Sequence, residues 1–401
     1  MEMVLEFLRD VLSQPALLIG IMSCIGLIAL KRPFHKVMTG TLKPILGYLM
    51  LAAGAGVIVN NLDPLGKMIE HGFHITGVVP NNEAIVAVAQ KVLGVETMSI
   101  LVVGLLMNLC IARFTKFKYV FLTGHHSLFM ACLMSAVLGT AGLSGMELIL
   151  VGGFLMGAWS AISPAIGQSY TSKVTDGDEI AIGHFGSLGY YLSAWVAKYV
   201  GKADDSTEDI EIPEKWGFLR DSTLSTALTM IVFYLIAAIA AGSEFVSTLS
   251  GDMSPYLYAV MSAMNFAVGV TIVYSGVRMI LGDLIPAFQG IATKIIPNAI
   301  PAVDCAVFFT YAPTAVVLGF LSSFIGGIIG MLILGAVGGV LIIPGLVPHF
   351  FCGATAGIYG NATGGRRGAA VGAFLNGLAI TFLPAMALPV LGQLGFQNTT
   401  F

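Results

Sequence analysis

Ionisable side chains occur at four places inside apolar stretches that glycine or proline interrupts. These residues are Glu83, His125 with His126, His184 and Asp304. Such groups are costly inside a membrane and tend to mark the path of a solute. Carboxylates accept hydrogen bonds from sugar hydroxyls, whereas imidazole can donate, accept or exchange a proton. The set therefore suits the binding of a small polyhydroxylated or mildly acidic solute.

Each of these residues also has a simpler structural interpretation. A carboxylate at Glu83 would stabilise the N-terminus of a half-helix, so capping and binding both remain open for it. His126 and His349 are more simply explained as packing or interfacial histidines. Binding is the better explanation for three residues, because buried charge is otherwise hard to justify. They are His125, His184 and Asp304.

The composition places these groups in a membrane. Of 401 residues, 56% are hydrophobic and only 10% are charged, against roughly 25% charged in a soluble domain. Apolar runs of about 20 residues recur, and each is long enough to cross a bilayer core of about 30 Å. These features exclude a soluble multi-domain enzyme, and a net charge of −3 excludes a polybasic nucleic-acid surface. We predict an all-α polytopic membrane protein with about ten or eleven transmembrane helices.

Basic residues predict the orientation of these spans. The spans lie near residues 14–30, 43–60, 96–112, 119–141, 146–167, 224–246, 256–281, 312–333, 334–351 and 369–391. Lysine and arginine gather in four connections, the longest of which is the polar loop 199–222. If all four are cytoplasmic, the N-terminus lies outside and the spans alternate consistently.

Two interrupted stretches indicate an internal repeat. A shift of 222 residues aligns Pro64 with Pro286 and also Asn82 with Asp304. The two stretches begin on opposite sides of the membrane in the predicted topology, as in an inverted repeat, whose broken helices meet near the midplane and bind substrate there. Chance recurrence in a glycine-rich chain is the alternative. The predicted halves are residues 43–141 and 256–360 of a single permease domain, 1–401.

A third irregular stretch, Thr175–Lys198, reads as a re-entrant hairpin with His184 near its tip. Other chemical signatures are weak. Ser144 lies in a Gly-Leu-Ser-Gly sequence like that of intramembrane serine proteases, but in a short connection. No nucleotide fingerprint and no zinc-type cysteine pattern occurs. We predict no catalytic residue, no cofactor and no metal.

Six short segments, in order and spacing from about residue 15 to residue 390, carry a family resemblance. They are residues 51–56, 122–125, 175–184, 302–305, 312–313 and 342–345. In these segments the chain resembles the ascorbate-type enzyme IIC permeases of the bacterial phosphoenolpyruvate-dependent phosphotransferase system.

The resemblance implies a multi-pass homodimer in the bacterial inner membrane. Each protomer would combine a core domain with a V-shaped scaffold, and the core would move as a rigid body in the manner of an elevator. The substrate, L-ascorbate or a related sugar acid or polyol, would be phosphorylated by a cysteine-phosphate on a cytoplasmic IIB protein that IIA charges. The family usually continues past Phe401 through another span, and a IIB domain can follow.

The resemblance also implies a set of residues around the substrate. They are Gly54, Asn81, Asn82, Glu83, His125, His184 and Asp304. Phe129 and Phe185 occupy two positions at which glutamines contact substrate in family members, and Glu83 stands at a tyrosine-like position. A phenyl ring can stack on a lactone but cannot bond to its hydroxyls, so the resemblance implies the transport class more firmly than strict ascorbate specificity.

Three other functions remain as alternatives. A proton- or sodium-coupled secondary transporter would use Glu83 or Asp304 as its coupling site. An intramembrane hydrolase would use Ser144, and a purely structural membrane subunit is disfavoured by so many polar groups at membrane depth.

Overall fold

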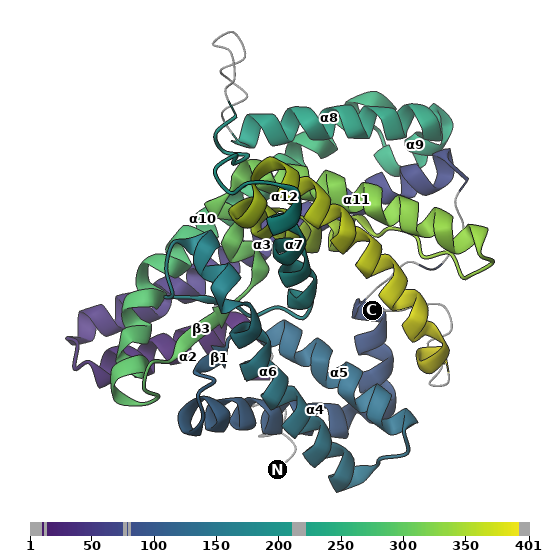
Figure 1. Cartoon of the computed structure of the whole chain (residues 1–401). Coiled ribbons are helices and arrows are strands. Elements are labelled where there is room, and N and C mark those ends of the chain that lie inside the picture. Colours follow the sequence, from purple (N-terminus) through teal and green to yellow (C-terminus); the bar gives the residue numbers. More distant parts are fainter. Residues whose placement is uncertain (1–9, 12–13, 75–77, 79–81, 211–221, 393–401) are drawn as a thin grey trace.

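The computed structural model describes residues 10–11, 14–74, 78, 82–210 and 222–392, and these are almost entirely helical (Figure 1). The α-helices are α2 (Pro15–Ala29), α3 (Phe34–Gly72), α4 (Asn82–Phe114), α5 (Gly124–Thr140), α6 (Gly145–Thr175), α7 (Ser187–Val200), α8 (Ser222–Ala241), α9 (Ser243–Ser250), α10 (Pro255–Lys294), α11 (Pro313–Ala336) and α12 (Leu346–Gly392). A 3₁₀ helix, η2 (Cys305–Tyr311), and three short strands complete the fold: β1 (Tyr119–Phe121), β2 (Ala181–Ile182) and β3 (Ile300–Val303).

Within the described ranges, six helices are long and apolar enough to cross a membrane, or up to seven if the bent pair α8 and α9 forms one span. The predicted all-α polytopic membrane fold is therefore confirmed. The sequence predicted ten or eleven spans, more than the structure counts, for two reasons. α12 contains the whole predicted span 369–391 after its break at Gly364 and Gly365, and the end of the predicted span 334–351 before that break. α5 is predicted as part of a span but is too short to be counted as one.

Two predicted spans are wrong in detail. Residues 119–121 form strand β1, so the helix predicted over 119–141 begins only at Gly124. The span predicted over 334–351 does not exist, because α11 ends at Ala336 and α12 starts at Leu346. Between them, Gly338 takes a positive φ of 72°. Hydropathy alone missed both breaks, since aromatic and branched residues that favour extended backbone are as apolar as helical ones.

The helices pack in two groups that touch each other sparsely. One group contains α2, α3, α8, α9 and α10, with α3 running along α10. The other contains α4, α5 and α6 together with α7, α11 and α12, in which α11 and α12 share the most extensive contact. Figure 1 shows α2, α3 and α10 side by side, with α4, α5 and α6 forming a separate layer.

Glycines let α3 and α10 cross closely. A Cβ at Gly54 would lie 2.8 Å from the carbonyl oxygen of Gly269, and a Cβ at Gly276 would lie 2.6 Å from that of Gly47. The pairs run in opposite order along the two helices, which are therefore antiparallel. Small residues at such crossings allow backbones to approach in a membrane. Gly54, expected near the substrate, thus has a packing role in the structure.

The strands form a small parallel sheet in the order β1-β3-β2, an element that the sequence analysis did not predict. Tyr119 pairs with Ile300, and Ala181 pairs with Ala302. A helix follows each strand within a few residues: α5 after β1, η2 after β3 and α7 after β2. Because parallel strands end at the same edge, the starts of these three helices are brought to one place.

The shift of 222 residues found in the sequence also relates the bounds of the helices. α3, moved by this shift, covers residues 256–294, which is α10 without its first residue. The last residue of α4 then matches that of α11, and the first residue of α5 matches that of α12. The short extended segments correspond as well. Val78, which the shift moves to position 300, bridges to Ile342, and Ile300 pairs with Tyr119.

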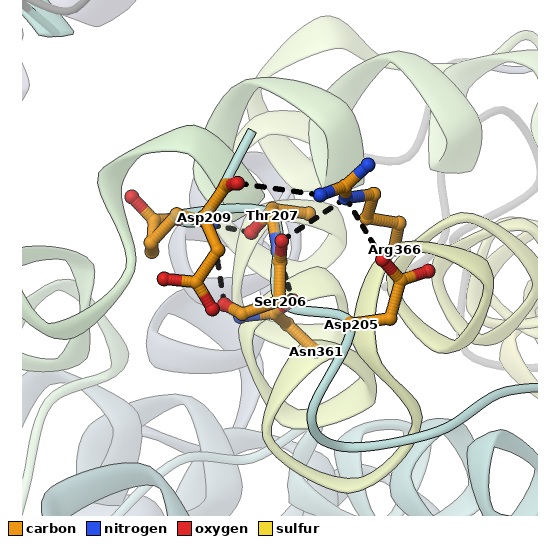
Figure 2. A network of polar contacts seen from close by, with 7 residues as sticks. Asp205, Ser206, Thr207, Asp209, Asn361 and Arg366 are labelled. Carbon is orange, nitrogen blue, oxygen red and sulfur yellow. Dashed lines mark hydrogen bonds and ion pairs between the residues drawn. The ribbon is translucent and has the colours of Figure 1, made fainter. Parts of the chain in front are cut away.

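The loop after α7 contacts both α11 and α12, and Figure 2 shows its polar contacts with Asn361 and Arg366 of α12. The Arg366 guanidinium, just past the break in α12, donates to the Ser206 carbonyl at 3.1 Å and lies 3.3 Å from the Asp205 carboxylate. The Asn361 side-chain oxygen accepts from the Thr207 amide at 2.8 Å. Glu208 accepts at 3.1 Å from two amides of the first turn of α11, those of Thr314 and Ala315.

We expect Glu208→Ala to lower the free energy of unfolding by about 1 kcal/mol, because the change leaves the first amides of α11 without their carboxylate partner. The measurement is the thermal midpoint of the purified protein in detergent. Asp204→Ala is the matched control, since Asp204 is exposed in the same loop and its side chain forms no hydrogen bond or ion pair with the residues that the structure describes. Equal losses in both variants would contradict a capping role.

Candidate functional site

Three ionisable side chains meet where the parallel sheet ends. His126 lies in the first turn of α5, His184 lies between β2 and α7, and Asp304 links β3 to η2. The rings of His126 and His184 have centroids 4.0 Å apart, and His126 Nε2 lies 4.0 Å from Asp304 Oδ2. All three residues are at most 8% exposed. We call them the histidine–aspartate cluster.

Asp304 is held in place by the helix that it precedes. It is the N-cap of η2, and its Oδ1 accepts a hydrogen bond from the Ala306 amide at 3.0 Å. This bond engages Oδ1, while the other carboxylate oxygen, Oδ2, is directed toward His126. A separation of 4.0 Å is too long for a hydrogen bond, so the interaction of the two groups is electrostatic.

His184 is fixed by the end of strand β2 and the start of α7. The Gly183 amide donates to the Val303 carbonyl at 2.7 Å, which extends the β2–β3 pairing up to His184. A Cβ at Gly183 would lie 2.6 Å from the Ala302 carbonyl oxygen, so glycine is required for this approach. His184 Nδ1 then lies 2.9 Å from both the Gly186 amide and the Tyr190 hydroxyl.

The two phenylalanines expected at the substrate lie in different surroundings. The Phe129 ring meets the His126 ring edge-on, with centroids 5.8 Å apart. Phe185 packs against an apolar cluster of α4, α5 and α6 that includes Ile100 and Met130. Phe129 therefore borders the histidine–aspartate cluster directly, and Phe185, next to His184 in the chain, contributes to the apolar packing among α4, α5 and α6.

The remaining predicted residues are only partly placed. Asn82 and Glu83 lie in the first turn of α4 and His125 in that of α5, but their side chains, like all of Asn81, are outside the described part of the structure. His349 is buried, with Nδ1 2.9 Å from Ser323 Oγ, as suits a packing histidine.

His126 requires a correction. We interpreted it as a packing histidine, yet its contacts with His184 and Asp304 place it in the cluster. Neighbouring residues on a helix point about 100° apart, and a sequence containing two adjacent histidines does not show which of them faces a site.

Three further residues at the site were missed. Tyr190 is fully buried and reaches His184. Tyr48 of α3 is buried within electrostatic reach of Asp304. Thr123, 1% exposed, is the N-cap of α5, and its hydroxyl has no hydrogen-bond partner in the described structure. Of these three, only Thr123 had a signal in the sequence, because it directly precedes the Gly-His-His motif. The two tyrosines lie in helices that only the tertiary structure brings close to the cluster.

The helix starts give the site a positive character. Helix N-termini carry partial positive charge and free amides. The Asp304 carboxylate offsets the partial positive charge at the N-terminus of η2. The N-cap residues of α5 and α7, Thr123 and Gly186, make no such side-chain hydrogen bond to their helices. Among the described residues, the site therefore offers several donors together with the Asp304 carboxylate as an acceptor, which suits a hydroxyl-rich or anionic solute. Among the residues that the structure describes, no three His, Cys, Asp or Glu side chains are arranged so that they could hold a metal ion.

The chain is similar to a known protein family and to a curated relative. The sequence model of the family described as "PTS system sugar-specific permease component" matches residues 10–401. The chain is also 27% identical, over 424 aligned residues, to the "Ascorbate-specific PTS system EIIC component" of Mycoplasma pneumoniae. That alignment covers 90% of this chain and 63% of the relative, so the chain spans less than two thirds of the relative's length.

Proposed function

The chain belongs to the family of sugar-specific permease components of the phosphotransferase system, and from this membership we propose that it binds and translocates L-ascorbate or a related small sugar acid or polyol. Passage is coupled to phosphorylation by a cytoplasmic IIB partner that carries the phosphoryl-donor cysteine and is charged by IIA. The chain itself supplies binding and passage. The name of the Mycoplasma pneumoniae relative supports ascorbate as the first solute to test.

The histidine–aspartate cluster is the observation that carries this proposal. L-Ascorbate is an anion at neutral pH and has several hydroxyls, so it needs both donors and an acceptor. His126, His184 and the uncapped start of α5 supply donors, and Asp304 Oδ2 supplies an acceptor. In this arrangement, His184 orients the hydroxyl that is phosphorylated.

The aromatic residues bear on which solute is accepted. Phe129, at the edge of His126, offers a flat apolar face on which a lactone ring can stack, but it cannot bond to hydroxyls. We therefore propose that specificity is broader than for a site lined with glutamines, and that related lactones and pentitols compete with ascorbate.

The proposed transport cycle rests on the two helix groups. α4, α5, α6, α7, α11 and α12 form the moving core, and α2, α3, α8, α9 and α10 form the scaffold. Sparse contact between the groups supports a rigid-body movement. The relation of helix bounds by 222 residues supports an inverted repeat with halves near 43–141 and 256–360. A homodimer in the bacterial inner membrane, an outside N-terminus and a cytoplasmic loop 199–222 belong to the same proposal.

Thermal shift in detergent tests the binding step. L-Ascorbate, related lactones and pentitols are each added to the purified protein, and the expected stabilisation is about 2.7 kcal/mol at one hundred times the Kd. Asp304→Asn is the control variant, in which this ligand shift should shrink because the acceptor charge is lost. If no hydroxylated solute shifts the wild-type midpoint, the proposed binding function is wrong.

One observation favours a second candidate, a proton-coupled transporter. The His126–Asp304 pair, an imidazole and a carboxylate 4.0 Å apart, is of the kind that carries protons. Uptake in cells with and without IIA and IIB separates the two functions. Phosphotransferase coupling requires both proteins and yields phosphorylated solute. Accumulation of unmodified solute that persists without them, and collapses with the proton gradient, would instead establish the second candidate.

The hydrolase alternative gains no support from the position of Ser144. This residue is exposed in the turn before α6, whereas the histidines of the cluster are buried. Loss of peptide cleavage in Ser144→Ala would be needed to revive it.

A further inference from the structure

We propose that Tyr190 is a positioning residue that, together with the Gly186 amide, holds His184 as a neutral imidazole with its proton on Nε2. The inference deepens the proposed function, on which its ligand-binding consequence rests. It assigns His184 the role of a hydrogen-bond donor toward the solute.

The Gly186 amide decides where the His184 proton lies. This amide points at Nδ1 from 2.9 Å, and a backbone N–H can only donate. Nδ1 must therefore present its lone pair. In a neutral imidazole the proton then lies on Nε2, the other ring nitrogen.

The Tyr190 hydroxyl makes a second contact with Nδ1 that is consistent with this assignment. It lies 2.9 Å from Nδ1, and since Nδ1 carries no proton, the hydroxyl is the donor. Tyr190 is fully buried, and its ring packs beside that of Tyr359, with centroids 5.9 Å apart. The hydroxyl is thus held in place by packing from α12, and His184 is oriented by a rigid neighbour.

The charges around His184 favour a neutral ring. The ionisable groups that face it or its partners are His126 of α5, Asp304 before η2, Tyr190 of α7, Tyr48 of α3, Cys305 of η2 and Cys352 of α12. A proton on Nδ1 would break the bond from the Gly186 amide and would require the Tyr190 hydroxyl to accept in place of donating. Asp304 Oδ2 lies 4.0 Å from His126 Nε2, so His126 is a ring of the cluster for which the structure shows a carboxylate neighbour.

This assignment constrains the bound solute. A hydroxyl oxygen that accepts from His184 Nε2–H keeps its own hydrogen, which needs another acceptor. The Asp304 carboxylate, whose Oδ2 lies 4.0 Å from His126 Nε2, is the acceptor that the cluster offers. An alcohol, which both donates and accepts, would suit this combination better than a group that only accepts.

Nuclear magnetic resonance of isotope-labelled histidine ring nitrogens tests the assignment in the full chain, in detergent and without ligand. The His184 signals are identified by their loss in His184→Gln or His184→Asn, whichever folds. We expect an unprotonated Nδ1 and a protonated Nε2, unchanged from about pH 8 to about pH 6. A proton on Nδ1, or a doubly protonated His184 in this range, would overturn the proposal.

Tyr190→Phe tests the positioning role, and Tyr191→Phe is its matched control. Tyr191 is the next residue of α7, and its buried hydroxyl donates to the Ser163 carbonyl at 2.9 Å. Both variants lose one buried hydroxyl bond, but only Tyr190→Phe should move the His184 nitrogen signals. It should also weaken ascorbate binding about three- to tenfold.

The ring-nitrogen signals and the ascorbate affinity test different claims, so each claim can be disproved without the other. If His184 shows the expected tautomer but ascorbate does not bind, the proposed substrate is wrong and the assignment stands. If Tyr190→Phe and Tyr191→Phe leave the His184 signals equally unchanged, Tyr190 is a packing residue and the positioning role is lost.

Discussion

Replacement of His184 by alanine is expected to abolish phosphorylation-coupled uptake while the protein still folds. The side chain is 6% exposed and lies between His126 and Tyr190. Its loss removes the donor that orients the reacting hydroxyl, and misplacement of that kind can cost about a hundredfold or more in rate. The measurement is uptake of labelled solute in cells that contain IIA and IIB, with the thermal midpoint of the purified variant as the check on folding.

Two variants sharpen this test. His184→Gln places an amide N–H near the position of Nε2, so it should retain part of the uptake that His184→Ala loses. His35→Ala should behave as the wild type, because His35 is exposed at the start of α3. Unchanged uptake in His184→Ala would remove this residue from the functional site.

Gly54→Leu is expected to destabilise the fold by about 3 kcal/mol, at the upper end of the cost of overpacking. A Cβ at this position would meet the Gly269 oxygen and the Val273 nitrogen, each 2.8 Å away, and these backbone atoms of α10 cannot rotate aside. α3 and α10 would have to separate along their crossing. The thermal midpoint in detergent measures the effect.

Gly56→Leu is the matched control, two residues along α3. Gly56 is exposed, and a Cβ there would have no neighbour within 4 Å. A thermal midpoint of Gly54→Leu as high as that of Gly56→Leu would refute the packing role. If Gly54 were a substrate contact, as the resemblance implied, Gly54→Ala would weaken ligand binding in the molecules that remain folded. Packing alone predicts lower stability with unchanged affinity.

The sequence by itself determined the environment and the family. A chain with 56% hydrophobic and 10% charged residues has too few charges to cover a water-exposed surface. Long apolar runs form helices in a bilayer because every backbone polar group must be satisfied within the segment. The cost of burying charge also made His184 and Asp304 stand out as site candidates, and both lie in the cluster that the structure describes.

Only the tertiary structure decided how the site is built. The strands around Tyr119, Ala181 and Ile300 are each two to four residues long, and their pairing joins segments far apart in the chain, so no local pattern reveals them. That pairing brings His126 to His184 and Tyr190 to Nδ1. The direction of a side chain on a helix, and the partner that fixes the proton of an imidazole, depend on contacts between distant segments. Hydropathy and spacing do not record such contacts.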